Sequence, residues 1–318
     1  MSQAPVAPAL LHRGEALDPP SAVPYPRVLP NGPFLGMTVV FGILLGFSAY
    51  ALLIPVANQL FLRIGFALRG GGDWAAYAAD AGAYRLPDGP VAGHLALALL
   101  IPISLLLTRY VHGLRPRWLA SVQPGMRWRY LLMTVVVAAV LLNAVIWAQW
   151  GLGEMPVWTN GQPGWVSFLL LIAVSSPLQA AAEEFFFRGY LLQAIGSATG
   201  RAWVGVVGSA LLFALMHGLQ NPALFAHRLV FGLVAGALVV LTGGLEAAIG
   251  AHIVNNISSY VYALFSVTVE GLRTVTGISW AEAGWNILAF AVFGLAAWWL
   301  ARKLNLAMTT PDPDLWRG

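Results

Sequence analysis

YLLMTVVVAAVLLNAVIWAQW, residues 130–150, contains no charged residue and is long enough to form a membrane-spanning helix. A helix of about 20 apolar residues crosses the roughly 30 Å of hydrocarbon in a bilayer. Stretches of this kind recur along the chain, and the sequence predicts an all-α, polytopic membrane protein with about eight transmembrane helices. The eight predicted spans are residues 34–61, 91–108, 130–150, 166–195, 203–220, 228–242, 246–269 and 283–301.

The composition of the whole chain agrees with a protein that lives in a bilayer. Its 318 residues are 58% hydrophobic and 9% charged, whereas a soluble domain has about 25% charged residues. The absence of cysteine excludes disulfides, thiolate metal ligands and a cysteine nucleophile. The net charge of +4 comes from arginines that lie between apolar stretches, which indicates membrane orientation and not nucleic-acid binding.

The segments outside the spans predict the orientation of the chain. Residues 1–33 contain eight prolines and no long apolar core, so we expect a disordered N-terminal tail. Residues 34–301 would form the transmembrane domain and residues 302–318 a C-terminal tail. The loop between the second and third spans, residues 109–129, is rich in arginine and has no acidic residue, which predicts a cytoplasmic location. With eight spans both termini then lie in the cytoplasm, in a bacterial inner membrane, although three arginines in residues 62–90 argue weakly against this orientation.

Charged residues interrupt one of the apolar stretches, AAAEEFFFRGYLL at residues 180–192. An ionised group near the bilayer centre costs from about 3 to more than 10 kcal/mol, so its presence requires a partner or a function. Glu184 and Arg188 are four residues apart and can pair on one helix face. Glu183 points about 100° away from that pair. The group could be a structural ion pair or an interfacial anchor, or part of a functional site.

Two later spans carry further polar residues. Phe213 and His217 occur in FALMHG, and His252 and Asn256 occur in HIVNN, where their spacing places both on one helix face. With Glu183 they supply a carboxylate and an imidazole that can deprotonate water, and donors for an oxyanion. This predicts a hydrolytic site enclosed by spans four to seven, which we expect to open toward the cytoplasm. A non-hydrolytic transporter or scaffold could use the same residues as a proton relay or structural network.

Other hydrolase mechanisms lack the residues they need. No histidine is followed by glutamate, which excludes an HExxH zinc site. Residues 70–73 spell the GxGD of intramembrane aspartyl proteases, but they lie in a glycine-rich loop and no Tyr-Asp partner motif occurs. Ser209 lies eight residues before His217, about two helical turns away. Surface or interfacial positions are expected for the remaining histidines, which are His12, His94, His112 and His227.

The three motifs occur in a fixed order along the chain. They are Glu183 and Glu184 with Arg188, then Phe213 with His217, then His252 with Asn256. This pattern resembles the CPBP family of intramembrane proteases, the CAAX protease and bacteriocin-processing proteins, also called the ABI or type II CAAX prenyl endopeptidase family. The resemblance covers about residues 165–260, which would form the catalytic core.

The resemblance also implies roles for these residues. Glu183 with His217 would activate the attacking water, and His252 with Asn256 would bind the oxyanion. Glu184 and Arg188, with Phe213, would support the helices that present these groups.

The resemblance leaves the cofactor open. The family is commonly labelled metalloendopeptidase, and Glu183, His217 and His252 could supply three zinc ligands and an open position for water. A metal-free mechanism, in which glutamate and histidine activate water directly, is also held for the family and is the one we favour. The implied substrate is a peptide or protein tail at the membrane surface, either a prenylated CAAX tail or a small secreted peptide. The sequence does not predict the oligomeric state.

Overall fold

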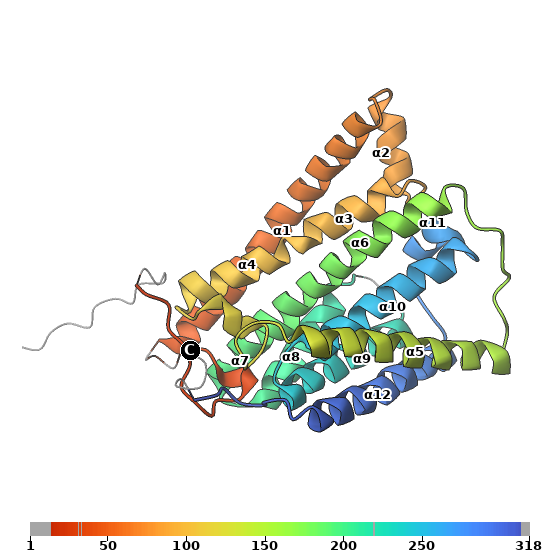
Figure 1. The fold of residues 1–318 in the computed structure, drawn as a ribbon. Coiled ribbons are helices and arrows are strands. Elements are labelled where there is room, and N and C mark those ends of the chain that lie inside the picture. The colour runs from red at the N-terminus through yellow and green to blue at the C-terminus, as the bar shows by residue number, and fades with distance from the viewer. Residues whose placement is uncertain (1–13, 31, 33, 219, 313–318) are drawn as a thin grey trace, which may run out of the picture.

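The computed structural model describes residues 14–312 except for residues 31, 33 and 219, and its regular elements are all helices (Figure 1). The α-helices are α1 (Leu35–Leu68), α2 (Trp74–Gly82), α3 (Asp88–Ala98), α4 (Leu100–Leu106), α5 (Trp128–Leu152), α6 (Trp165–Glu183), α7 (Leu192–Thr199), α8 (Ala202–Leu215), α9 (Pro222–Thr242), α10 (Glu246–Leu264), α11 (Thr268–Arg273) and α12 (Trp280–Lys303). Shorter elements are the 3-10 helices η1 (Tyr25–Arg27) and η3 (Pro116–Leu119) and the π-helices η2 (Leu107–Val111) and η4 (Glu184–Leu191). The predicted all-α class is confirmed.

Six helical rods in the described part of the chain are long and apolar enough to cross a membrane. They are Leu35–Leu68, Asp88–Val111, Trp128–Leu152, Trp165–Thr199, Pro222–Thr242 and Trp280–Lys303. Two of these rods combine several elements, since α3, α4 and η2 run on from one another, as do α6, η4 and α7. The chain is therefore a polytopic membrane protein.

Fewer than the predicted eight spans are found in the described residues. Helices α8 and α10 are not long and apolar enough to count as membrane-spanning helices. The 14 residues of α8 rise only about 21 Å, short of the hydrocarbon thickness. Helix α10 has 19 residues, but it carries His252, Asn255 and Asn256 in place of apolar side chains. These two helices are the ones that end at or contain the predicted His217 and His252 motifs.

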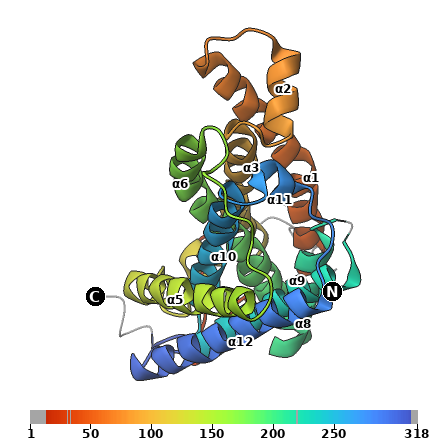
Figure 2. The ribbon, with the colours of Figure 1, turned by 90° about the vertical axis from the view of Figure 1, so that its right-hand side faces the viewer.

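Helix α10 occupies the middle of the bundle (Figure 1). It packs against α5 and α6, while α12 packs against α5 and α9. Figure 2 shows that α2 and the adjoining end of α1 lie far from α5 and α12. On the outside of α1, Leu44, Leu52 and Val56 are 63%, 68% and 67% exposed, as expected for side chains that contact lipid.

Small residues allow α8 and α9 to approach closely. A Cβ atom on Gly232 would come within 2.9 Å of the Ala210 Cβ, and one on Gly236 within 3.0 Å of Val206. Glycines four residues apart permit such contacts between membrane helices. The same Gly232 Cβ would lie 3.2 Å from Arg188, so this crossing borders the buried charges of η4.

The N-terminal segment from residue 14 to residue 30 packs against the helices, in contrast to the disordered tail predicted for residues 1–33. Tyr25, Val28 and Leu29 are at most 2% exposed, and the Tyr25 hydroxyl donates to the Leu119 carbonyl at 2.5 Å. The prolines do not keep this segment from packing against the bundle, because its apolar side chains contact the ends of the membrane helices. The rest of the predicted tail lies outside the described residues.

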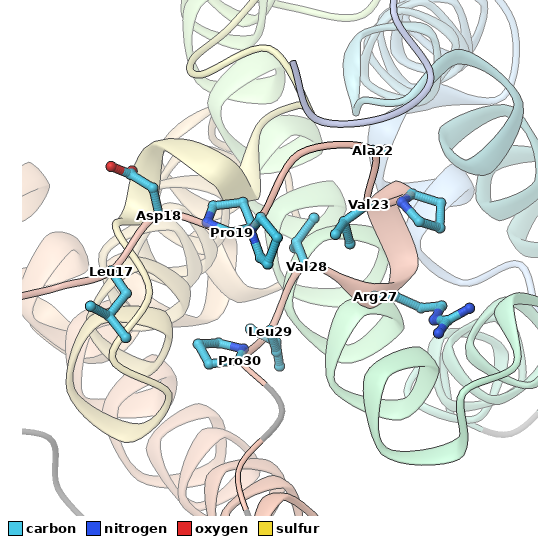
Figure 3. Close-up of a pocket in the computed structure, with 11 residues that line it drawn as sticks. Leu17, Asp18, Pro19, Ala22, Val23, Arg27, Val28, Leu29 and Pro30 are labelled. Carbon is cyan, nitrogen blue, oxygen red and sulfur yellow. The ribbon is translucent and has the colours of Figure 1, made fainter. Parts of the chain in front are cut away.

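This segment surrounds a cavity of about 490 Å³ lined by its own residues 17–30 (Figure 3). Asp18 and Arg27 lie at opposite sides of the view and direct their charged groups away from Val28. Asp18 accepts hydrogen bonds from the Trp118 indole at 2.7 Å and from Arg117 at 3.0 Å. The cavity therefore contains no cluster of reactive side chains, and its charged groups serve to attach the segment.

Candidate active site

The end of α6 and the π-helix η4 place three charged residues inside the bundle. Glu184 and Arg188 have fully buried side chains, and the Arg188 Nη1 donates to the Glu184 Oε1 at 3.0 Å. The Arg188 guanidinium also lies 4.0 Å from the centre of the Phe213 ring, a cation–π contact. π-helical segments inside α-helices are frequent at functional sites, and here one of eight residues begins directly after Glu183.

Glu184 has a second partner that the sequence did not predict. The Nδ1 of His252 lies 2.7 Å from the Glu184 Oε1. A carboxylate can only accept, so Nδ1 carries the proton and donates. This bond fixes the orientation of the imidazole, and it joins η4 to α10.

The other nitrogen of His252 faces Glu183. The His252 Nε2 and the Glu183 Oε2 are 3.6 Å apart, which is too long for a direct hydrogen bond. The Glu183 Oε2 is buried and has no hydrogen-bond partner among the described residues. The histidine within ion-pair distance of Glu183 is therefore His252. The resemblance to the family had implied His217 as the partner of Glu183.

His217 lies at the end of α8, next to the same cluster. Its Nδ1 donates to the Phe213 carbonyl at 2.7 Å, which leaves Nε2 as the free nitrogen of the neutral ring. The rings of Phe213 and His217 are 4.5 Å apart, and those of Phe213 and His252 are 6.0 Å apart. Glu183 and His252 both lie within electrostatic range of His217. The structure thus brings the residues of all three motifs to one region.

Asn256 is held by a residue that the sequence analysis missed. Its Nδ2 donates to the Gln179 Oε1 at 2.9 Å, and its Oδ1 accepts from Asn255 at 3.2 Å. Gln179 precedes Glu183 by one helical turn and therefore faces the same way. The four-residue spacing from Glu183 and the presence of a polar side chain in an apolar span could have identified Gln179 from the sequence.

A cavity of about 330 Å³ adjoins the cluster. Its lining includes His217, His252 and Asn256, together with His227 and Arg228 of α9. The amide group of Asn256 retains a second N–H that Gln179 does not use. A peptide group in this cavity would meet imidazole and amide donors.

His227 lines this cavity and is not an interfacial residue at a helix start. Its ring stacks on Phe290 at 5.6 Å, and both ring nitrogens lack partners within the described part of the chain.

His94 and His112 also differ from expectation, because both are buried. His94 contacts the Ser175 and Tyr260 hydroxyls, and the His112 Nε2 lies 3.1 Å from the Tyr190 hydroxyl. His12 lies outside the described residues.

The geometry does not fit the zinc site considered from the sequence. Within residues 14–312, as far as they are described, no three His, Cys, Asp or Glu side chains gather closely enough to hold a metal ion. Glu183 and His252 are near one another, but His217 does not complete a set of three ligands with them. We therefore derive no step through a metal, and the metalloendopeptidase label has no support in this arrangement.

A membrane-embedded helical bundle with buried glutamates and histidines beside a cavity is the class of protein that these observations define. Residues 162–258 match the family of type II CAAX prenyl endopeptidase Rce1-like proteins. This region of the chain is therefore similar to an Rce1-like domain, as the resemblance predicted, and that family is described as one of endopeptidases. The matched range contains Glu183, His217, His252 and Asn256.

A comparison with curated proteins found a bacterial relative. The uncharacterized protein YyaK of Bacillus subtilis (strain 168) is 29% identical over an alignment of 225 residues, and the alignment covers 66% of this chain and 75% of the relative. No solved structure matches the chain.

Proposed function

We propose that this protein is an intramembrane endopeptidase in which Glu183 activates water for attack on a peptide bond. The observation that carries the proposal is the buried Oε2 of Glu183, which has no hydrogen-bond partner among the described residues and lies 3.6 Å from the Nε2 of His252, a residue that lines the cavity. A carboxylate in this position can take a proton from water, and its low-dielectric surroundings strengthen its effect on nearby charges.

In the proposed reaction, Glu183 accepts one proton from a water molecule while the water oxygen bonds to the carbonyl carbon of the peptide. The Nε2 of His217 helps to hold this water. As the tetrahedral intermediate collapses, the C–N bond breaks and Glu183 returns its proton to the leaving amine. The products are a carboxylic acid and an amine, and transfer of the acid proton to the amine leaves a carboxylate and an ammonium group.

The negative charge on the carbonyl oxygen requires donors during this reaction. We assign this role to the Nε2 of His252, which can donate whenever it carries a hydrogen, and to the second N–H of the Asn256 amide. Both side chains are held in place, His252 by Glu184 and Asn256 by Gln179. Such pre-positioning is needed for effective stabilisation of a developing charge.

Exchange of Glu183 for glutamine tests the proposal, because it keeps the size of the side chain and removes the base. Proteins from wild-type cells and from cells with Glu183→Gln would be compared by mass spectrometry of their peptide ends. We expect at least one processed protein to accumulate uncleaved in the Glu183→Gln cells. The matched control is Glu154→Gln, which changes an exposed glutamate outside the bundle.

Unchanged processing in the Glu183→Gln cells would show that Glu183 is not the catalytic base. The buried glutamates and histidines would then be assigned to a structural network or to a proton relay of a transporter. Altered processing in the Glu154→Gln cells as well would show that the effect is not specific to the site.

A further inference from the structure

The catalytic cavity opens at one particular end of the bundle. Phe213 and His252 line the part of the cavity that adjoins Arg188 and Glu183. Leu272 of α11 and Val275 and Ile278 of the loop that follows line another part. The Asn221 side chain donates to the Ile278 carbonyl at 2.7 Å and fixes this loop beside the cavity.

Backbone contacts show which helix ends lie at this mouth. Gln162 donates to the Leu264 carbonyl at 2.9 Å, so the start of α6 adjoins the end of α10. Asn221 donates to the Thr276 carbonyl at 2.9 Å, which places the start of α9 beside the loop before α12. We call this the α11 end of the bundle.

The two termini of the described chain lie together at the opposite end. The Thr310 N–H donates to the Val23 carbonyl at 2.9 Å, and the Thr310 carbonyl accepts from the Ala22 N–H at 2.9 Å. Close to them, Val122 donates to the carbonyl of Gly243, just after the end of α9. In Figure 1 the N-terminal segment lies at the left and α11 lies at the right. We call the end of the bundle with Val23 and Thr310 the terminal end.

Basic residues are distributed unequally between the two ends. The terminal end carries Arg27, Arg109, Arg115, Arg117, Arg127, Arg129, Arg201, Arg302 and Lys303. The α11 end carries Arg63, Arg69, Arg85, Arg228 and Arg273. An excess of lysine and arginine marks the cytoplasmic side of a membrane protein, which assigns the terminal end to the cytoplasm.

Two of the three arginines at residues 62–90, which argued against this orientation in the sequence, are held by acidic residues in the structure, and the third, Arg63, stacks on Trp74 at 3.7 Å. Arg69 pairs with Asp88 at 2.5 Å, and Arg85 pairs with Glu270 at 2.9 Å. Arg85 and Glu270 join the loop before α3 to α11. These arginines therefore have a structural role at the α11 end.

From the cavity mouth and the charge distribution together, we propose that the active site receives its substrate from the extracytoplasmic side of the membrane. The substrate class is then a peptide segment of an exported or membrane-anchored protein, and not the prenylated tail of a cytoplasmic protein. This inference rests on the proposed function for the substrate, but the sidedness of the cavity does not depend on catalysis. It also replaces the expectation that the site opens toward the cytoplasm.

Because the chain contains no cysteine, single cysteines can report on sidedness without background labelling. Val275→Cys places a thiol at the cavity mouth, where the native side chain is 43% exposed. Ser259→Cys places one inside the cavity with almost no change in side-chain size. Gln123→Cys is the matched control, on an exposed loop residue at the terminal end.

Spheroplasts and inverted membrane vesicles would be treated with a membrane-impermeant maleimide. We expect Val275→Cys and Ser259→Cys to be labelled in spheroplasts, and Gln123→Cys to be labelled only in inverted vesicles. Labelling of Gln123→Cys in spheroplasts would overturn the proposal. So would labelling of Ser259→Cys from the cytoplasmic side alone.

The cleavage sites give an independent measurement. Proteins that accumulate uncleaved in Glu183→Gln cells should have their cleavage sites in segments outside the cytoplasm. Cleavage sites in cytoplasmic tails would overturn the inference while leaving the endopeptidase intact. If no protein accumulates, the proposed function fails, and the labelling result still decides on which side the cavity opens.

Discussion

The Glu184 Oε1 accepts hydrogen bonds from two helices, from the His252 Nδ1 at 2.7 Å and from the Arg188 Nη1 at 3.0 Å. The pair that the sequence predicted as a brace within one helix therefore also orients a histidine on α10. Because Glu184 and Arg188 are fully buried, loss of either charge would leave the other without compensation.

The change Glu184→Gln should lower both stability and activity. Removing one partner of a buried ion pair costs about 3–5 kcal/mol in the free energy of unfolding, because the remaining charge is uncompensated. We expect thermal unfolding in detergent to occur at lower temperature, with reduced cleavage of the accumulating substrate. Glu154→Gln, at an exposed position, should alter neither property.

A double variant separates the two effects of Glu184. In Glu184→Gln/Arg188→Met both charges are removed, so much of the stability should return. Cleavage should stay low, since neutral glutamine does not hold the His252 Nδ1–H as a carboxylate does. Full cleavage by the double variant would show that Glu184 acts only through stability.

Gln179→Ala should reduce the rate of cleavage with little effect on folding. The change removes the acceptor of the Asn256 amide, and a neutral hydrogen bond contributes about 1 kcal/mol. If that bond positions the oxyanion donor, kcat should fall about fivefold while KM changes little. Gln123→Ala, on an exposed loop, is the control. A rise in KM at constant kcat would assign Gln179 to substrate binding instead.

Gly232→Ala should destabilise the protein, since its Cβ would lie 2.9 Å from the Ala210 Cβ and 3.2 Å from Arg188. Overpacking of this kind costs about 1–3 kcal/mol. Gly284→Ala is the matched control in α12, where an added Cβ meets nothing within 4 Å. There the same exchange should stabilise the helix by about 0.5–1 kcal/mol. Equal unfolding temperatures for the two variants would show that the α8–α9 crossing is not closely packed.

Asp18 should attach the N-terminal segment at every pH from 5 to 8. Burial alone would raise the pKa of Asp18, but hydrogen bonds from Trp118 and Arg117 and the charges of Arg117 and Arg115 lower it below 3.8. The stabilisation is complete above the unfolded-state pKa of about 3.9 and is lost only as the pH falls through the lower folded-state value.

Hydrogen exchange of residues 14–30 checks this prediction. Asp18→Asn should speed exchange at the Ala22 N–H, which donates to the Thr310 carbonyl at 2.9 Å, by the same factor at pH 5 and pH 8. Glu15→Gln should have a small effect on exchange. The Glu15 side chain is 88% exposed, and its ion pair with Arg115 is long, at 3.5 Å between Oε1 and Nη2. Loss of protection in the wild type between pH 8 and pH 5 would contradict the assignment.

The sequence predicted the helical class, six of the membrane helices and the resemblance to the family, because apolar runs and residue spacings are local properties. The spacing of Glu184 and Arg188 was enough to predict their pairing, which the structure confirms. The roles assigned to Glu183, His217, His252 and Asn256 stay predictions, although their side chains lie in one region.

The remaining features depend on contacts between distant parts of the chain. The π-helix, the bond from His252 to Glu184 and the support of Asn256 by Gln179 arise from how η4, α6 and α10 lie against each other. The ordered segment around Tyr25 likewise required partners on η3 and α7 that no local pattern reveals. The side of the membrane on which the cavity opens stays a prediction. Which elements form the cavity was decided by tertiary structure, because its wall combines α9, α10 and α12, whose relative heights are set by packing alone.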